Sequence, residues 1–320
     1  MSATASGSVL LAMSTPPYWH CGRTVRTLSL YMLAGCLPVV VMAIWNWGLP
    51  AARVMALCVA VSVATEALCV RLMGREQTVD DLTAVCSGLL FAFLLPAAAP
   101  WWLAVLGSVV CITLGKMFFG GLGASPVCAP LVGWAVLAVS FPLLMDPNAA
   151  QLDTAFVDPL VRLKFFGAHA AASLPLSDLL LGRQINGLGA GQVLALCAGG
   201  VFLVGCGAAR WQIPFGFFLG IVGMAALLQM TDPAQNASPL FHLCTGSTVL
   251  GGFFLATVTG TTPLRPLPMF LYGLLAGFLT MAIRKYGVWL DGVPFAVLLA
   301  NLLTPYFDMI RPKPFGGRLP

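Results

Sequence analysis

Charged residues are scarce in this chain. They make up only 8% of the 320 residues, whereas 59% are hydrophobic. An ordinary soluble domain carries roughly 25% charged residues. So few charges cannot cover a soluble globule of this size, and lipid must cover part of its surface. The net charge of +5 comes from arginines and lysines that flank apolar blocks, so we expect no binding to nucleic acid.

Motifs for metal or hydrolytic chemistry are also missing. None of the ten cysteines forms a CxxC pair, and none lies beside a histidine at zinc spacing. Most of them lie inside apolar blocks, where a small buried thiol is the ordinary outcome. The sequence has no Rossmann turn and no hydrolase triad. We therefore expect no metal site in this chain and no complete soluble enzyme.

The apolar residues fall in blocks that are long enough to cross a bilayer, which takes roughly 17–25 residues. The third block is short, ends at Leu95-Pro96 and is followed by Pro100-Trp101-Trp102. That pattern predicts a broken or re-entrant element, which is tolerated only where protein covers the backbone. The expected spans are 27–48, 51–73, 83–97, 101–118, 127–145, 191–209, 213–230, 241–259, 267–284 and 292–310.

Basic residues predict the orientation. With the N-terminus inside, ten of the 16 lysines and arginines fall on the cytoplasmic side, which favours a multi-pass protein with both termini in the cytoplasm. We expect a cytoplasmic tail at 1–24, a first membrane repeat at 25–145, an external loop at 146–190, a second repeat at 191–310 and a cytoplasmic tail at 311–320.

A short internal echo suggests a duplication. Cys86-Ser87-Gly88 recurs as Cys244-Thr245-Gly246, and each half holds about five spans. An odd number of spans forces the second copy to be inverted in the membrane, and such repeats place a site at their interface. The predicted fold class is an all-α polytopic membrane protein of about ten transmembrane helices in two inverted five-helix repeats. Chance similarity remains the alternative.

Two stretches could bind a ligand. Lys116 precedes Gly120, Gly121 and Gly123, so the backbone could approach an anionic group closely; a helix break with close packing is the alternative. Phe241–Thr248 carries hydroxyls that could bind a polar ligand or join helices by hydrogen bonds. Glu66 lies inside the second span, where a charge is either functional or paired with a neighbouring helix.

Five segments together resemble a known family. The chain is similar, from about residue 25 to 315, to the D subunit of the Rnf electron-transport complex, which is related to the B subunit of the sodium-pumping NADH:quinone reductase. The segments that carry the resemblance are DLTAVCSGLLFAFLLP (81–96), GKMFFGGLG (115–123), LSDLLLGRQINGLG (176–189), LFHLCTGSTVLGGFFLAT (240–257) and DGVPFAVLLANLLTPYFD (291–308).

The resemblance implies a urea-channel-like architecture and a flavin. Its members carry FMN joined through phosphate to a threonine in a motif like S-G-A-T-P-L. Here Asp158 stands at the threonine's position, followed by Pro159-Leu160, and aspartate has no hydroxyl to form that phosphoester. We therefore expect FMN, if it is held, to be bound noncovalently, with riboflavin as the alternative flavin.

The resemblance further implies a membrane subunit of an ion-translocating oxidoreductase in the bacterial inner membrane. Electrons would pass between ferredoxin and NAD, coupled to Na⁺ or H⁺ movement, with the A, B, C, E and G subunits as partners. A urea-channel-like transporter and a flavin-less assembly scaffold remain alternatives. The predicted pocket, shared between the repeats, consists of Lys116, Gly120, Gly121, Gly123, Thr245, Gly246, Ser247 and Thr248, with Lys116 stabilising an anionic flavin.

Overall fold

The computed structural model describes residues 23–74, 78–150, 158–172, 174–233 and 235–310. The expected tails therefore lie almost entirely outside the described residues, as do residues 151–157 just before Asp158. Every regular element in the described part is a helix. Four helices are long and apolar enough to cross a membrane, and five further apolar helices are shorter.

The first half holds five of these helices. α1 (Val25–Trp47) and α2 (Leu49–Leu72) are long, whereas α3 (Thr83–Leu94), α4 (Trp101–Ile112) and α5 (Ala129–Ser140) are short. A 3₁₀ turn, η1 (Val79–Asp81), precedes α3, and a π-helical turn, η2 (Thr113–Met117), extends α4. The first five expected spans therefore begin and end within five residues of these helical segments.

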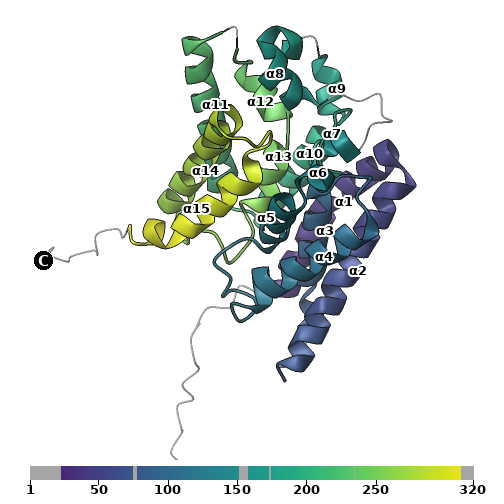
Figure 1. Ribbon diagram of the computed structural model, residues 1–320. Coiled ribbons are helices and arrows are strands. Elements are labelled where there is room, and N and C mark those ends of the chain that lie inside the picture. Colours follow the sequence, from purple (N-terminus) through teal and green to yellow (C-terminus); the bar gives the residue numbers. More distant parts are fainter. Residues whose placement is uncertain (1–22, 75–77, 151–157, 173, 234, 311–320) are drawn as a thin grey trace, which may run out of the picture.

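The segment 142–190 contains short helices at one end of the bundle (Figure 1). They are α6 (Pro142–Met145), α7 (Pro147–Ala150), α8 (Pro159–Ala172) and α9 (Leu176–Leu180). The second half follows with α10 (Val193–Gly205), α11 (Gln212–Thr231), α14 (Pro266–Tyr286) and α15 (Val293–Asp308). Between α11 and α14 the chain breaks into α12 (Pro239–Cys244), α13 (Thr248–Leu250) and a π turn, η3 (Gly251–Leu255).

The packing of the two halves follows similar pairs. α2 packs on α4 and α4 on α5, while α11 packs on α14 and α14 on α15. Contacts between the halves run from α1 to α10 and from α5 to α15. In Figure 1, α1 to α4 lie on one side of the molecule, and α11, α14 and α15 lie on the other.

The break after α3 is covered by protein, as the sequence predicts. α3 ends at Leu94 because Pro96 cannot continue a hydrogen-bonded helix. The freed carbonyls of Phe93 and Leu95 accept hydrogen bonds from the backbone of Gly189 (3.1 Å) and Leu188 (2.8 Å). A Cβ on Gly189 would lie 2.5 Å from the Phe93 ring, so only glycine allows this approach.

The loop 184–191 also contacts the break in the second half, which follows α12. The buried Gln184 amide donates to the carbonyls of Gly191 (2.8 Å) and Cys244 (3.1 Å), and Cys244 is the last residue of α12. Backbone groups freed inside a membrane protein must find partners within the protein. The segment 184–191 therefore satisfies both broken helices, and this structural task explains a motif that had no evident chemistry in the sequence.

Candidate functional site

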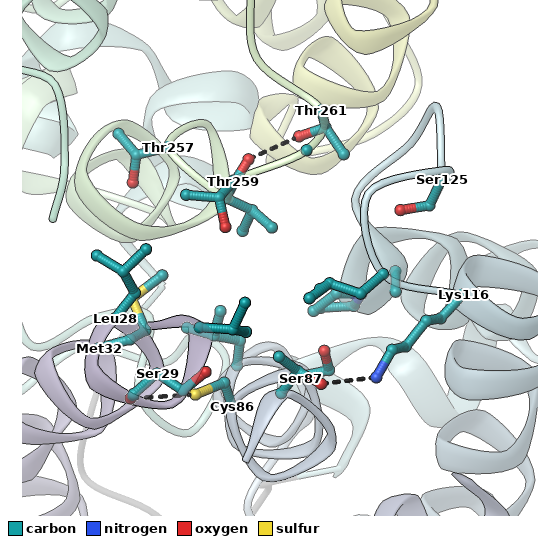
Figure 2. Close-up of a pocket in the computed structure, with 18 of the residues that line it drawn as sticks. Leu28, Ser29, Met32, Cys86, Ser87, Lys116, Ser125, Thr257, Thr259 and Thr261 are labelled. Carbon is teal, nitrogen blue, oxygen red and sulfur yellow. Dashed lines mark hydrogen bonds between the residues drawn. The ribbon is translucent and has the colours of Figure 1, made fainter. Parts of the chain in front are cut away.

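A largely apolar cavity of about 340 Å³, called cavity 1, opens at the end of the bundle where α1 and α3 begin. Figure 2 shows Lys116 and Ser125 of the first half facing Thr259 and Thr261 of the second half across it. Sites for small molecules and cofactors are typically about 300–1,000 Å³, mostly apolar and furnished with a few polar groups. The polar side chains that line cavity 1 are Ser29, Thr83, Ser87, Lys116, Ser125, Thr257, Thr259 and Thr261.

Both π turns border cavity 1. Lys116 lies within η2, where the Phe118 amide donates to the Thr113 carbonyl five residues back (2.8 Å). Thr257 follows η3, where the Ala256 amide donates to Gly251 in the same way (2.8 Å). A π turn inserts one extra residue into a helix and so redirects the side chains after it, and such turns are frequent at functional sites.

A buried ion pair forms part of the wall. The Lys116 ammonium donates to Glu66 Oε1 (2.7 Å) and to the Thr83 hydroxyl (2.6 Å), and the Thr78 hydroxyl donates to the same Glu66 oxygen (2.7 Å). Glu66 is completely buried and Lys116 is 5% exposed. The other carboxylate oxygen, Glu66 Oε2, is buried with no hydrogen-bond partner among the described residues.

This pair decides between the two interpretations of Glu66. The intramembrane carboxylate is paired with a neighbouring helix, since η2 extends α4 and Glu66 lies on α2. The Lys116 charge is therefore already balanced, which corrects the simpler expectation that Lys116 stands ready for an anionic ligand. Because Lys116 also lines cavity 1, a charge change in the cavity would act on the pair at low dielectric, where such effects are strong.

The glycine loop acts mainly through its backbone. Gly120, Gly121 and Gly123 all have positive φ, at 107°, 106° and 86°, which only glycine adopts without strain. Of these three glycines, Gly123 lines cavity 1. A Cβ on Gly260 would lie 3.6 Å from the Gly123 Cα, so the loops of the two halves meet at the rim of the cavity.

The second stretch predicted to bind a ligand, Phe241–Thr248, forms contacts within the protein instead. Arg284, 6% exposed, donates to the carbonyls of His242 and Thr245 (both 3.1 Å) and to the Thr248 hydroxyl (2.7 Å), and it pairs with Asp291 (3.0 Å). The Ser247 amide (2.7 Å) and hydroxyl both donate to the other Asp291 oxygen. These contacts clamp the break between α12 and α13, which favours the interpretation that the hydroxyls of this stretch join helices.

Asp158 lies near this clamp. A cavity of about 210 Å³, called cavity 3, is lined by Asp158, Gly246, Ser247, Asp291 and other residues. The Asp158 carboxylate accepts from the amides of Leu160 (2.8 Å) and Val161 (3.3 Å) and so caps α8. Burial raises the pKa of Asp158 from 3.8, and the nearby Asp291 charge raises it further, against the lowering effect of the hydrogen bonds from Asn148 and the two amides.

The expectation of one shared pocket is wrong. Lys116 and Gly123 line cavity 1, whereas Gly246 and Ser247 line cavity 3, and the two cavities share no lining residue. α3 runs from one to the other, from Thr83 to Leu94, which at 1.5 Å per residue is roughly 18 Å. The Thr245 carbonyl accepts from Arg284 and from the Thr248 hydroxyl, which in turn accepts from Arg284, and neither threonine lines cavity 1.

The sequence alone does not predict which residues of the second half line cavity 1. These include Thr257, Thr259, Gly260 and Thr261. The signal was present as TVTGTT at 257–262, a cluster of hydroxyls in an otherwise apolar region. The repeated Cys-Ser/Thr-Gly pattern instead favours residues 244–246 as part of the site, and these residues lie at the other end of the bundle.

These features define a class: a polytopic helical membrane protein with broken helices and a largely apolar cavity bordered by a buried ion pair. Comparison with known proteins then identifies the family. The chain matches the NQR2, RnfD, RnfE family over residues 12–316 and belongs to it. It is 34% identical to the D subunit of the ion-translocating oxidoreductase complex of Klebsiella pneumoniae (strain 342), over 97% of this chain and 100% of that protein. The corresponding D subunits of Salmonella typhi and Salmonella typhimurium (strain LT2) are each 33% identical over 97% of this chain and 99% of theirs.

Proposed function

We propose that this chain is the membrane-embedded D subunit of an Rnf-type ion-translocating electron-transport complex and that it holds a flavin in cavity 1. The relatives' names and the full-length similarity support the subunit assignment. The A, B, C, E and G subunits are the proposed partners. The observation that carries the flavin assignment is a cavity built from both halves and bordered by a buried ion pair.

The residues of cavity 1 fit a flavin. Apolar side chains such as Met32, Leu90 and Leu203 provide faces on which a planar ring system can lie. The hydroxyls of Ser87, Ser125 and the threonines at 257–261 provide donors and acceptors for a polar ring edge or a ribityl chain. A bound flavin would supply the electron-transfer chemistry, while the protein supplies placement and electrostatics.

The chain's own residues would tune that chemistry. The apolar lining excludes water, which lowers the local dielectric constant. The Glu66–Lys116 pair adds a fixed dipole with little net charge at the wall. Glu66 Oε2 has no partner among the described residues, so Glu66 can accept a further hydrogen bond as the charge in the cavity changes. This coupling between cavity charge and a buried carboxylate is the proposed link to ion movement.

We further propose that the two halves are inverted repeats of five elements each. The equivalent elements would be α1 and α10, α2 and α11, α3 and the broken segment α12–η3, α4 and α14, and α5 and α15. The matching packing pairs support this, as do the contacts of α1 with α10 and α5 with α15. The basic residues favour the inner membrane with both termini in the cytoplasm. Cavity 1 would then face the cytoplasmic side.

A transport path is the rival function. Cavities 1 and 3 lie at the two ends of α3 and α5, as the gates of a path would. However, the fully buried Phe91 and Phe93 lie along α3 between Leu90, which lines cavity 1, and Leu94, which lines cavity 3, and this argues against an open path along α3. Uptake of solutes into liposomes that contain only this chain would favour the rival.

Two measurements test the proposal. A tagged full-length chain, solubilised in mild detergent, should retain the other five subunits, and recovery of the chain alone from its native membrane would contradict the subunit assignment. The purified chain should show the visible absorption of oxidised flavin. Lys116→Met should lose that absorption, whereas the control Arg71→Met, exposed at the end of α2, should keep it.

A further inference from the structure

A cavity larger than cavity 1 lies outside the proposed flavin site. This cavity 2, about 460 Å³, is bounded by α8, α12 and the final turns of α11 and α14. It lies at the cavity 3 end of the bundle, since Leu160 and Leu290 line both cavities. Because α11 and α14 are long enough to cross a membrane and end at Thr231 and Tyr286, the cavity lies at the level where lipid headgroups meet the protein.

The lining of cavity 2 is cationic. Lys164, Arg284 and Lys285 line it together with His242, and none of its lining residues is an aspartate or glutamate. The Arg284 charge is balanced by Asp291, which does not line this cavity. Among the residues that the structure describes, Lys164 donates only to the carbonyls of Gly287 (2.7 Å) and Val288 (3.3 Å).

Lys285 likewise has a neutral partner, the Asn236 side-chain oxygen (2.8 Å). Within the described ranges, neither lysine forms an ion pair. Desolvation lowers the pKa of Lys164, which agrees with a cation that lacks a compensating negative charge. Cavity 2 therefore presents two uncompensated ammonium groups on adjacent elements.

Two buried polar atoms on its lining residues also lack partners among the residues described. Arg284 Nε donates to nothing although both terminal nitrogens of the guanidinium are bonded. His242 Nδ1 is likewise unsatisfied. Both side chains are at least nine-tenths buried, at 6% and 5% exposure. Both atoms have almost no accessible surface, so they lie behind the wall of cavity 2, and the cavity's charge toward a ligand comes from Lys164 and Lys285.

Apolar side chains surround the basic lining. Phe165 and Phe166 of α8 line the cavity yet are 71% and 72% exposed, and Leu227, Met230 and Leu240 of α11 and α12 are 61%, 83% and 61% exposed. A ligand with an anionic head and apolar chains matches this combination, because the head meets the cations and the chains cover the exposed helices. Basic pockets between membrane helices recognise anionic lipid headgroups in this way.

We propose that cavity 2 binds a phosphate ester, and that the ester is the headgroup of an anionic phospholipid such as phosphatidylglycerol. Lys164 and Lys285 neutralise the phosphate, while the buried guanidinium of Arg284 forms part of the cavity wall. A soluble phosphate ester or inorganic phosphate has the same chemistry, and the exposed apolar rim favours the lipid. This site is independent of the flavin in cavity 1.

The test uses the full-length chain, delipidated in detergent and then given phosphatidylglycerol, phosphatidylcholine, glycerol phosphate or inorganic phosphate. Native mass spectrometry and thermal unfolding report binding. The wild-type protein should bind one phosphatidylglycerol selectively and gain thermal stability over phosphatidylcholine. Lys164→Met/Lys285→Met should weaken that binding roughly 30-fold, from about a factor of five per cation near a membrane surface.

The matched control is Arg26→Met/Arg71→Met, which removes two exposed charges at the other end of the bundle and should bind like the wild type. If glycerol phosphate or inorganic phosphate binds as well as the lipid in a lysine-dependent way, the phosphate site stands and its source is soluble. If wild-type protein does not distinguish phosphatidylglycerol from phosphatidylcholine and binds neither phosphate, the proposal is wrong. The same holds if both double variants lose binding equally. The wild-type comparison does not depend on the folding of any variant.

Discussion

Removal of the Lys116 charge should destabilise the protein strongly, and a second substitution should restore it. Lys116→Met leaves the fully buried Glu66 with Thr78 as its remaining donor among the described residues and with Oε2 still lacking a partner there. Breaking a buried pair by removing one member costs about 3–5 kcal/mol, whereas replacing both members by neutral groups is often neutral or stabilising. For a large domain, at about 2–4 °C per kcal/mol, Lys116→Met should lower Tm by roughly 6–20 °C.

The assay is thermal unfolding of the purified full-length chain in detergent, followed by tryptophan fluorescence. Wild type, Glu66→Gln, Lys116→Met and the double variant form a double-mutant cycle, and Arg71→Met on α2 controls for charge loss alone. The double variant should unfold near the wild-type temperature. Additivity of the single effects to within about 0.5 kcal/mol would mean that the two side chains do not interact, and it would refute the ion pair.

Three further predictions concern the opposite end of the bundle. Gly189→Val should destabilise by at least about 1–3 kcal/mol through overpacking against Phe93, whereas Gly223→Val on α11, where a Cβ meets nothing, should be far milder in the same unfolding assay. The pKa of Asp158 is raised above 3.8 in the folded protein, so the protonated carboxyl contributes fully to stability below that pH. This contribution is lost as pH rises through the folded pKa. Asp158→Asn should therefore gain stability relative to wild type as pH increases above about 4. Denatured, gel-separated protein should show no flavin fluorescence, and Asp158→Thr alone should not create a covalent attachment.

Each of these has a distinct contrary outcome. Equal destabilisation by the two glycine variants would show that the approach of the 184–191 loop to α3 is not tight. A Tm difference between wild type and Asp158→Asn that stays constant across acid pH would show that the Asp158 pKa is not raised. Flavin that survives denaturation would show that another hydroxyl carries it, and mass spectrometry of tryptic peptides would locate that residue.

Much of the fold follows from composition and proline placement. Long apolar blocks can only be buried in lipid or in a helical bundle, so most of the expected spans coincide with helices. The break at Leu95-Pro96 follows from the missing proline amide. The segment 241–259 was expected as one span but is split, because Gly246 with φ of 69° turns the chain and Arg284 and Asp291 hold it there.

The site was harder to predict because it depends on contacts distant in sequence. Glu66 and Lys116 are 50 residues apart, and no periodic pattern in the sequence predicts their pairing. The hydroxyls at 245–248 and those at 257–261 look alike in sequence, yet the first group is bonded within a helix break and the second faces cavity 1. Only the packing of the two halves distinguishes these roles.

The location of the flavin tests the proposed function most directly. Equilibrium binding of riboflavin and FMN, followed by flavin fluorescence, should be compared in three full-length proteins: wild type, Ser87→Trp, which fills cavity 1, and Asn186→Trp, which fills cavity 3. We expect Ser87→Trp to abolish binding and Asn186→Trp to preserve it. Binding that survives Ser87→Trp and is lost in Asn186→Trp would contradict the assignment of the flavin to cavity 1 and place it at the other end of the bundle.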